Sequence, residues 1–187
     1  MPKIVRDWVD IYFEYGIDQT NRRIFLHSGI EEYTIEQVIK GIYLLNSNSK
    51  DKPIEIYVGT LGGDEYEMLG LYDVIRSCEC RIITIGVGKV MSAGPLILAA
   101  GDERQAFPHT SFMVHESWWD SPGIKFSEHE KVIKHYGQLH KTWTALMEER
   151  TGTPAKVWQK MCKGPDVYFD VHKAKELGII DKIIGEK

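Results

Sequence analysis

The chain has 187 residues, of which 43% are hydrophobic and 27% are charged, a composition typical of a folded globular protein. Its net charge of −4 offers no basic surface for nucleic acid, and no apolar stretch reaches the roughly 20 residues that a membrane span requires. The N-terminal segment MPKIVRDWVD has charges where a signal peptide would be apolar. We therefore expect a single cytoplasmic domain over residues 1–187 that binds neither nucleic acid nor membranes.

The cysteines give no sign of a metal site. Cys78, Cys80 and Cys162 form an odd set without the paired spacing of zinc ligands. They are best interpreted as reduced and mostly buried thiols, and we expect no bound metal.

The first half of the chain predicts two strand and helix units. An apolar run at residues 24–27 predicts a short strand. The following segment, GIEEYTIEQVIKGIYLLN, predicts a helix opened by a capping box of Thr34 and Gln37. A second strand is predicted at PIEIYVG, residues 53–59, and the glycine turn TLGG at residues 60–63 leads from it into a second helix.

The middle of the chain repeats the order of strand, turn and helix. RIITIGVG, residues 81–88, is rich in β-branched residues and predicts a buried strand. The next stretch, GKVMSAGPLILAAG, predicts a turn and an apolar helix that Gly101 closes in a left-handed conformation. SFMVH, residues 111–115, predicts a further strand.

A long helix dominates the C-terminal third. Ser127 and Glu130 form a second capping box at its start, its apolar residues from Val132 to Met147 predict one inward face, and Gly152 ends it. A shorter helix, a short strand, a helix opened by an aspartate N-cap and a final strand follow. Strands that alternate with helices in this way predict an α/β fold with largely parallel strands.

Ser92 has two interpretations. Serine is a preferred N-cap, and Pro95 in the first turn of the predicted helix fits that role. The same position places the hydroxyl beside unpaired N–H groups at the positive end of a helix, where an oxyanion would be stabilised. From the local residues alone, both interpretations stay open.

Three further features could complete a catalytic group. Gly62 and Gly63 can serve a turn with positive φ, or can present N–H groups to a carbonyl oxygen. His115, at the end of a strand, is either a core histidine or a general base. Asp166 can cap its own turn or orient a histidine. A serine nucleophile needs such a base and acid, and chain order places all three at the ends of strand and helix units.

Three segments occur in the order typical of the ClpP family, the proteolytic subunits of ATP-dependent Clp proteases: VGTLGG, GVGKVMSAGPLILAAGDERQAFPHTSFMVHES and DVYFDVHKAKELGIIDKII. The chain resembles this family from about Ile24 to the C-terminus. The resemblance implies a crotonase-like fold with a protruding handle loop and helix at about residues 116–150. It also implies a serine endopeptidase with Ser92 as nucleophile, His115 as general base and Asp166 as the acid that orients it.

The resemblance also assigns binding groups. It implies an oxyanion hole formed by the N–H groups of Gly63 and Ala93, and substrate contacts at Gly62 and Leu61. The subunit itself needs no cofactor, because ATP would be used only by a partner unfoldase.

The implied partners are unfolded polypeptides, further copies of the chain in two stacked heptameric rings, and an AAA+ Clp unfoldase. Tyr57 and Glu55 lie where the docking pocket for the unfoldase is expected. Trp118 and Trp119 suit either a contact between rings or the substrate groove.

The chain also departs from the family. It has Thr60 and Leu61 where Ser-Pro usually precedes the two glycines, and residues 1–20 do not resemble the family's axial loop. Such divergence fits a phage-type or otherwise specialised member. Two other functions stay open: a non-catalytic ring or scaffold subunit, and a crotonase-type acyl-CoA enzyme, for which Asp64 and Glu65 are the only acids near the glycine turn.

Overall fold

The structure is a computed structural model that describes residues 8–117 and 125–186. Its elements in chain order are α1 (Trp8–Tyr15), β1 (Ile17–Asp18), β2 (Arg23–Leu26), α2 (Glu32–Asn48), β3 (Ile54–Thr60), α3 (Glu65–Ser77), β4 (Ile82–Met91), α4 (Gly94–Ala99), β5 (Glu103–Ala106), β6 (Ser111–Val114), η1 (Phe126–Glu128), α5 (His129–Thr151), α6 (Ala155–Met161), β7 (Val167–Phe169), α7 (Val171–Glu176) and β8 (Lys182–Ile183). The predictions for Trp118 and Trp119, for residues 1–7 and for the loop at residues 118–124 lie outside the described residues.

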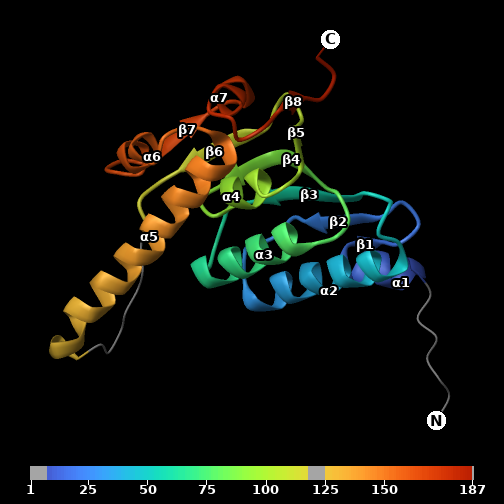
Figure 1. Cartoon of the computed structure of the whole chain (residues 1–187), viewed down its shortest axis with the longest axis horizontal. Helices are drawn as coiled ribbons and strands as arrows, with labels where there is room; N and C mark the ends of the chain where they lie inside the picture. Colours follow the sequence, from blue (N-terminus) through green and yellow to red (C-terminus); the bar gives the residue numbers. More distant parts are fainter. Residues whose placement is uncertain (1–7, 118–124, 187) are drawn as a thin grey trace.

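Within the described residues, the strands form one eight-stranded sheet in the order β1-β2-β3-β4-β5-β8, with β6 attached to β4 and β7 to β6. Only the β1/β2 and β6/β7 pairs are antiparallel. Figure 1 shows α2 and α3 side by side against the sheet, and α5 projecting away from it. The predicted α/β fold with largely parallel strands is confirmed. No helix in the described part of the chain is long and apolar enough to cross a membrane.

The central strand β4 has different partners along its two halves. It pairs in parallel with β3 on one edge. On the other edge, residues 83–86 pair with β5 and residues 89–91 pair with β6. The two halves are separated by a register shift in the pairing with β3, between Val58 and Thr60. Gly88, with a φ of 67°, lies at the same point of β4. A bulge of this kind bends a strand, so one edge of β4 holds two neighbours in succession.

The core lies between β3, β4 and the helices that cover them. Ile54, Ile56 and Val58 alternate along β3 and are fully buried. Leu71 of α3 and Leu45 of α2 are also fully buried in this cluster. The apolar side chains of the strands and those of the helices therefore pack against each other on one face of the sheet.

Several helix ends agree with their sequence signals. The Asp64 carboxylate accepts hydrogen bonds from the N–H groups of Tyr66 and Glu67 at the start of α3. Asp170 caps α7 in the same way, and α5 ends at Gly152 with a φ of 73°. Asp170 and Gly152 perform the roles predicted for them, whereas the cap at Asp64 was not predicted.

Three other predicted helix ends are wrong. Helix α2 begins at Glu32, before Thr34, whose hydroxyl lies 3.3 Å from that of Ser28. Ser127 lies within η1, and no side chain caps α5. Gly101 does not have positive φ, but a Cβ at this position would lie 2.4 Å from the Thr84 Oγ1. The glycine is therefore needed for space rather than for backbone conformation.

Burial of the thiols agrees with the sequence prediction. Cys80 and Cys162 are buried, Cys78 is half-buried, and all three are free. Burial raises the pKa of the Cys162 thiol to about 12, with a smaller effect from the Glu116 carboxylate. No group of metal-ligating side chains is found among residues 8–117 and 125–186.

Arg150 fixes the base of the handle helix α5 to the body of the protein. Its guanidinium donates hydrogen bonds to the carbonyls of Ala99 and Gly101, at 3.0 and 2.9 Å. Burial lowers the pKa of Arg150, but an arginine remains charged at neutral pH. These charge-assisted bonds satisfy carbonyls at the end of α4, the helix that follows Ser92.

We expect Arg150→Met to lower the free energy of unfolding by about 2 kcal/mol, because two carbonyls lose a charged donor. The measurement is the urea unfolding midpoint at fixed protein concentration, followed by circular dichroism. Lys141→Met, at an exposed position of α5, is the control and should leave the midpoint unchanged. Equal midpoints for the two variants would contradict the anchoring role.

Candidate active site

The register between β4 and β6 brings Ser92 and His115 together. Met91 pairs with Met113, so the residues that follow these parallel strands leave the sheet at the same edge. The Ser92 N–H donates to the Met113 carbonyl at 2.9 Å, which holds the end of β4 against β6. The Ser92 Oγ lies 2.7 Å from the His115 Nε2. This is the geometry of a hydroxyl that can pass its proton to an imidazole.

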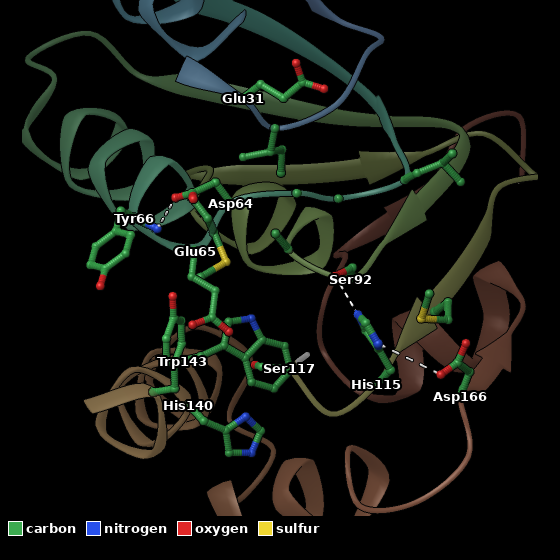
Figure 2. Close-up of a pocket in the computed structure, with 18 residues that line it drawn as sticks. Glu31, Asp64, Glu65, Tyr66, Ser92, His115, Ser117, His140, Trp143 and Asp166 are labelled. Atoms are coloured by element: carbon green, nitrogen blue, oxygen red, sulfur yellow. Dashed lines mark hydrogen bonds and ion pairs between the residues drawn. The ribbon is translucent and has the colours of Figure 1, made fainter. Parts of the chain in front are cut away.

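Asp166 reaches the same histidine from the opposite side. Strands β6 and β7 are antiparallel with Val114 opposite Val167, which places Asp166 beside His115. The Asp166 Oδ1 lies 3.9 Å from the His115 Nδ1, within ion-pair range but too far for a hydrogen bond. The Asp166 side chain is 49% exposed, while that of His115 is 16% exposed. The serine and histidine are thus in contact, and the aspartate stands just beyond contact (Figure 2).

The backbone of Ser92 excludes the capping interpretation. Its φ is 58°, a left-handed conformation that costs a residue with a Cβ roughly 1–2 kcal/mol. Helix α4 begins at Gly94 with Ala93 at the N-cap position, and no side chain caps it. The Ser92 hydroxyl is directed at His115 instead, and strained conformations of this kind cluster at functional sites.

The glycine turn lies directly against the serine. Gly62 and Gly63 have φ values of 101° and 153°, so both are in the region that favours glycine. A Cβ on Gly62 would lie 2.4 Å from the Ser92 Cβ, and one on Gly63 would lie 2.2 Å from the Ile30 carbonyl oxygen. The turn therefore needs glycine both for its conformation and for close approach.

Thr60 holds this turn, a role that the sequence pattern did not predict. The fully buried Thr60 hydroxyl donates to the Ser28 carbonyl at 2.7 Å and accepts from the Gly62 N–H at 3.0 Å. A threonine hydroxyl in a turn commonly accepts a hydrogen bond from the backbone N–H two residues further along the chain, and TLGG has this spacing. The side chain of Thr60 thus fixes the turn locally.

Two backbone donors are available beside Ser92. Among the described residues, no backbone or side-chain acceptor receives a hydrogen bond from the N–H groups of Gly63 and Ala93. Gly63, Ala93 and Ser92 all line the same pocket. Unpaired N–H groups beside a nucleophile can stabilise the negative charge that develops on an attacked carbonyl oxygen.

The pocket has a volume of about 880 Å³ and extends well beyond the serine. Figure 2 shows Ser92 and His115 at one end, and Glu65 and Trp143, from α3 and α5, at the other. Leu61 also lines the pocket and is 60% exposed. The volume is sufficient for side chains of a bound peptide.

The predicted docking residues lie elsewhere, on β3, and do not line this pocket. The Glu55 carboxylate accepts from the Arg23 Nε at 2.9 Å and from the Tyr57 hydroxyl at 3.0 Å. Burial, followed by the contact with Glu55, raises the pKa of Tyr57, and its ring stacks on Phe25 at 5.0 Å. These residues form a separate surface with a charged pair at its centre.

Comparisons with known proteins show the family to which the chain is similar. A family model described as Clp protease matches residues 8–187. The ATP-dependent Clp protease proteolytic subunit of Bacteroides fragilis is 30% identical over 96% of this chain and 85% of that protein. Subunit 3 from Synechococcus sp. (strain CC9605) is 28% identical over 95% of this chain and 88% of that protein.

A solved structure of a ClpP1 mutant from Listeria monocytogenes superposes with a TM-score of 0.81 at 27% identity. The match covers 90% of this chain and 94% of that one. The predicted crotonase-like fold is confirmed by this similarity.

We expect Gly62→Ala to slow the reaction of Ser92 with a fluorophosphonate by on the order of 100-fold, because the added Cβ would displace the serine. The rate is followed by mass spectrometry of the labelled protein. The control is Gly70→Ala in α3, where an added Cβ meets nothing within 4 Å. If both variants are labelled at the same rate, Gly62 does not position Ser92.

Proposed function

The chain belongs to the Clp protease family, and from this premise we propose that it is a serine endopeptidase that hydrolyses unfolded polypeptides in the cytoplasm. The observation that carries the proposal is the 2.7 Å contact between Ser92 Oγ and His115 Nε2 in a large open pocket. The neighbouring donors and the glycine turn support it, because a nucleophile alone does not hydrolyse an amide.

In the proposed mechanism, Ser92 attacks the scissile carbonyl while His115 accepts its proton. The N–H groups of Gly63 and Ala93 stabilise the oxyanion that forms. His115 then protonates the leaving amine, and a water molecule activated by the same imidazole hydrolyses the acyl-enzyme. No step requires a metal or an organic cofactor, and ATP would serve only a partner unfoldase.

Asp166 has the role of orienting His115 and stabilising its positive charge. From 3.9 Å, the carboxylate must approach the His115 Nδ1 by about 1 Å to form a hydrogen bond. Asp166 precedes β7, a strand of three residues with a single partner, so this movement need not disturb the Ser92 contact. The 3.9 Å distance between Asp166 and His115 also favours the second candidate function, that of a non-catalytic ring or scaffold subunit.

The handle helix supports assembly into rings. Its predicted inward face is buried only near the body of the protein, at Trp143 and Met147. Towards its start, Ile133 is 59% exposed, and Val132 and Tyr136 are half-buried. We propose that a second ring covers this part of α5, so that two heptameric rings enclose the active sites.

An AAA+ unfoldase is the proposed source of substrate, and Tyr57 is the proposed point of docking. A docking segment there would meet the Arg23–Glu55 pair, at side-chain exposures of 41% and 30%, rather than a purely apolar pocket. The acyl-CoA alternative has less support, because of the two acids near the glycine turn the Asp64 carboxylate is occupied as the cap of α3, which leaves only Glu65 to act as acid or base.

We expect Ser92→Ala to abolish fluorophosphonate labelling and to lower hydrolysis of unfolded casein by at least about 1,000-fold, since the nucleophile is lost. Hydrolysis is measured by release of a fluorophore from labelled casein. Ser47→Ala, whose hydroxyl donates only to the Leu44 carbonyl on α2, is the matched control. An assembled wild-type protein that is not labelled would exclude the peptidase and leave the scaffold role.

We expect Ile133→Glu to halve the native mass of the assembly, because a charge in an apolar contact between rings is costly to bury. Native mass spectrometry provides the measurement. Gln138→Glu introduces the same charge at another exposed position of α5 and should leave the mass unchanged. An unaltered mass for both variants would contradict the contact proposed for the handle.

A further inference from the structure

One carboxylate oxygen of Glu65 is buried without a hydrogen-bond partner in the candidate active site. The Glu65 Oε2 is buried and has no hydrogen-bond partner among the described residues. Glu65 is the first residue of α3, just after the glycine turn, and Figure 2 shows its side chain running towards Trp143 of α5. A buried carboxylate oxygen without a partner is costly, so the pocket is suited to a ligand group, above all a cationic one, that donates a hydrogen bond to it.

No lysine or arginine in the described part of the chain performs this task, and the lining groups that can become cationic are His115 and His140. The residues that line the pocket include Glu31, Asp64 and Glu65 but no lysine or arginine. The Asp64 carboxylate accepts hydrogen bonds from the N–H groups that it caps, whereas the Glu65 Oε2 has no donor. The potential in this part of the pocket is therefore negative and favours a cationic ligand.

The walls of the pocket suit a long side chain with a charged end. Ile30, Met68 and Trp143 line it together with Glu65. The methylene stem of a lysine or arginine packs on such apolar surfaces, and its charged group can meet the carboxylate at the end. An indole near that position also favours a guanidinium.

We propose that Glu65 is a specificity-determining residue, which binds a lysine or arginine side chain next to the scissile bond. The inference rests on the proposed peptidase function, because it places that bond at Ser92. It extends the function by assigning a substrate class: unfolded polypeptides cleaved beside basic residues.

The test compares two fluorogenic peptides that differ only by arginine or citrulline next to the scissile bond. Citrulline keeps the size and most hydrogen-bond donors of arginine but has no charge. We expect the wild-type kcat/KM to be at least about tenfold higher for the arginine peptide, and this ratio to fall close to one in Glu65→Gln, the neutral isostere. Glu67→Gln, on the same turn of α3 but not in the pocket lining, should keep the wild-type ratio.

A binding measurement separates this inference from the proposed function. The same two peptides, labelled with a dye, are titrated with Ser92→Ala and with the Ser92→Ala/Glu65→Gln double variant, and Kd is read from fluorescence anisotropy. Tighter binding of the arginine peptide that depends on Glu65 supports the inference without any hydrolysis. Equal Kd values for the two peptides, or no binding of either, overturn it. Failure of fluorophosphonate to label the wild-type Ser92 overturns the peptidase function instead.

Discussion

The candidate active site depends on the pairing of β4 with β6. One edge of β4 first holds β5 and then β6, and only the second pairing places Met113 opposite Met91. Backbone hydrogen bonds of a parallel ladder define this register to within one residue, and a slip by one residue would turn the side chains to the other face. The 2.7 Å contact between Ser92 and His115 follows from that register. The strained φ of Ser92 is tolerated because the strands on either side over-determine its position.

Residues whose roles follow from the order of strands and helices along the chain could be predicted from the sequence. Residues whose roles depend on contacts between distant segments could not. Asp170 and Gly152 were predictable, because an N-cap and a left-handed C-cap are set by local backbone geometry. Gly101 was misread, because its neighbour Thr84 is distant in sequence. Thr34 formed a plausible capping box, but the helix began before it.

Ser92 and Glu65 show the same limit within the site. A serine before a short helix has the sequence signature of a cap, and only the backbone conformation excludes that role. Glu65 is an acid near the glycine turn, but the α5 residues that line the pocket with it are distant in sequence. Whether a carboxylate faces water or lacks a partner depends on elements some 80 residues apart, which no local pattern encodes.

The contact between Gly62 and Ser92 also limits how this protein can change by mutation. Any side chain at Gly62 would meet the Ser92 Cβ at 2.4 Å, and any at Gly63 would meet the Ile30 carbonyl at 2.2 Å, so neither position has an acceptable alternative residue. Leu61 between Thr60 and these glycines is 60% exposed and meets no such restriction. Variation in this turn is thus confined to Leu61, a residue that lines the pocket. A lineage could therefore alter the peptides that it accepts while the nucleophile stays in place.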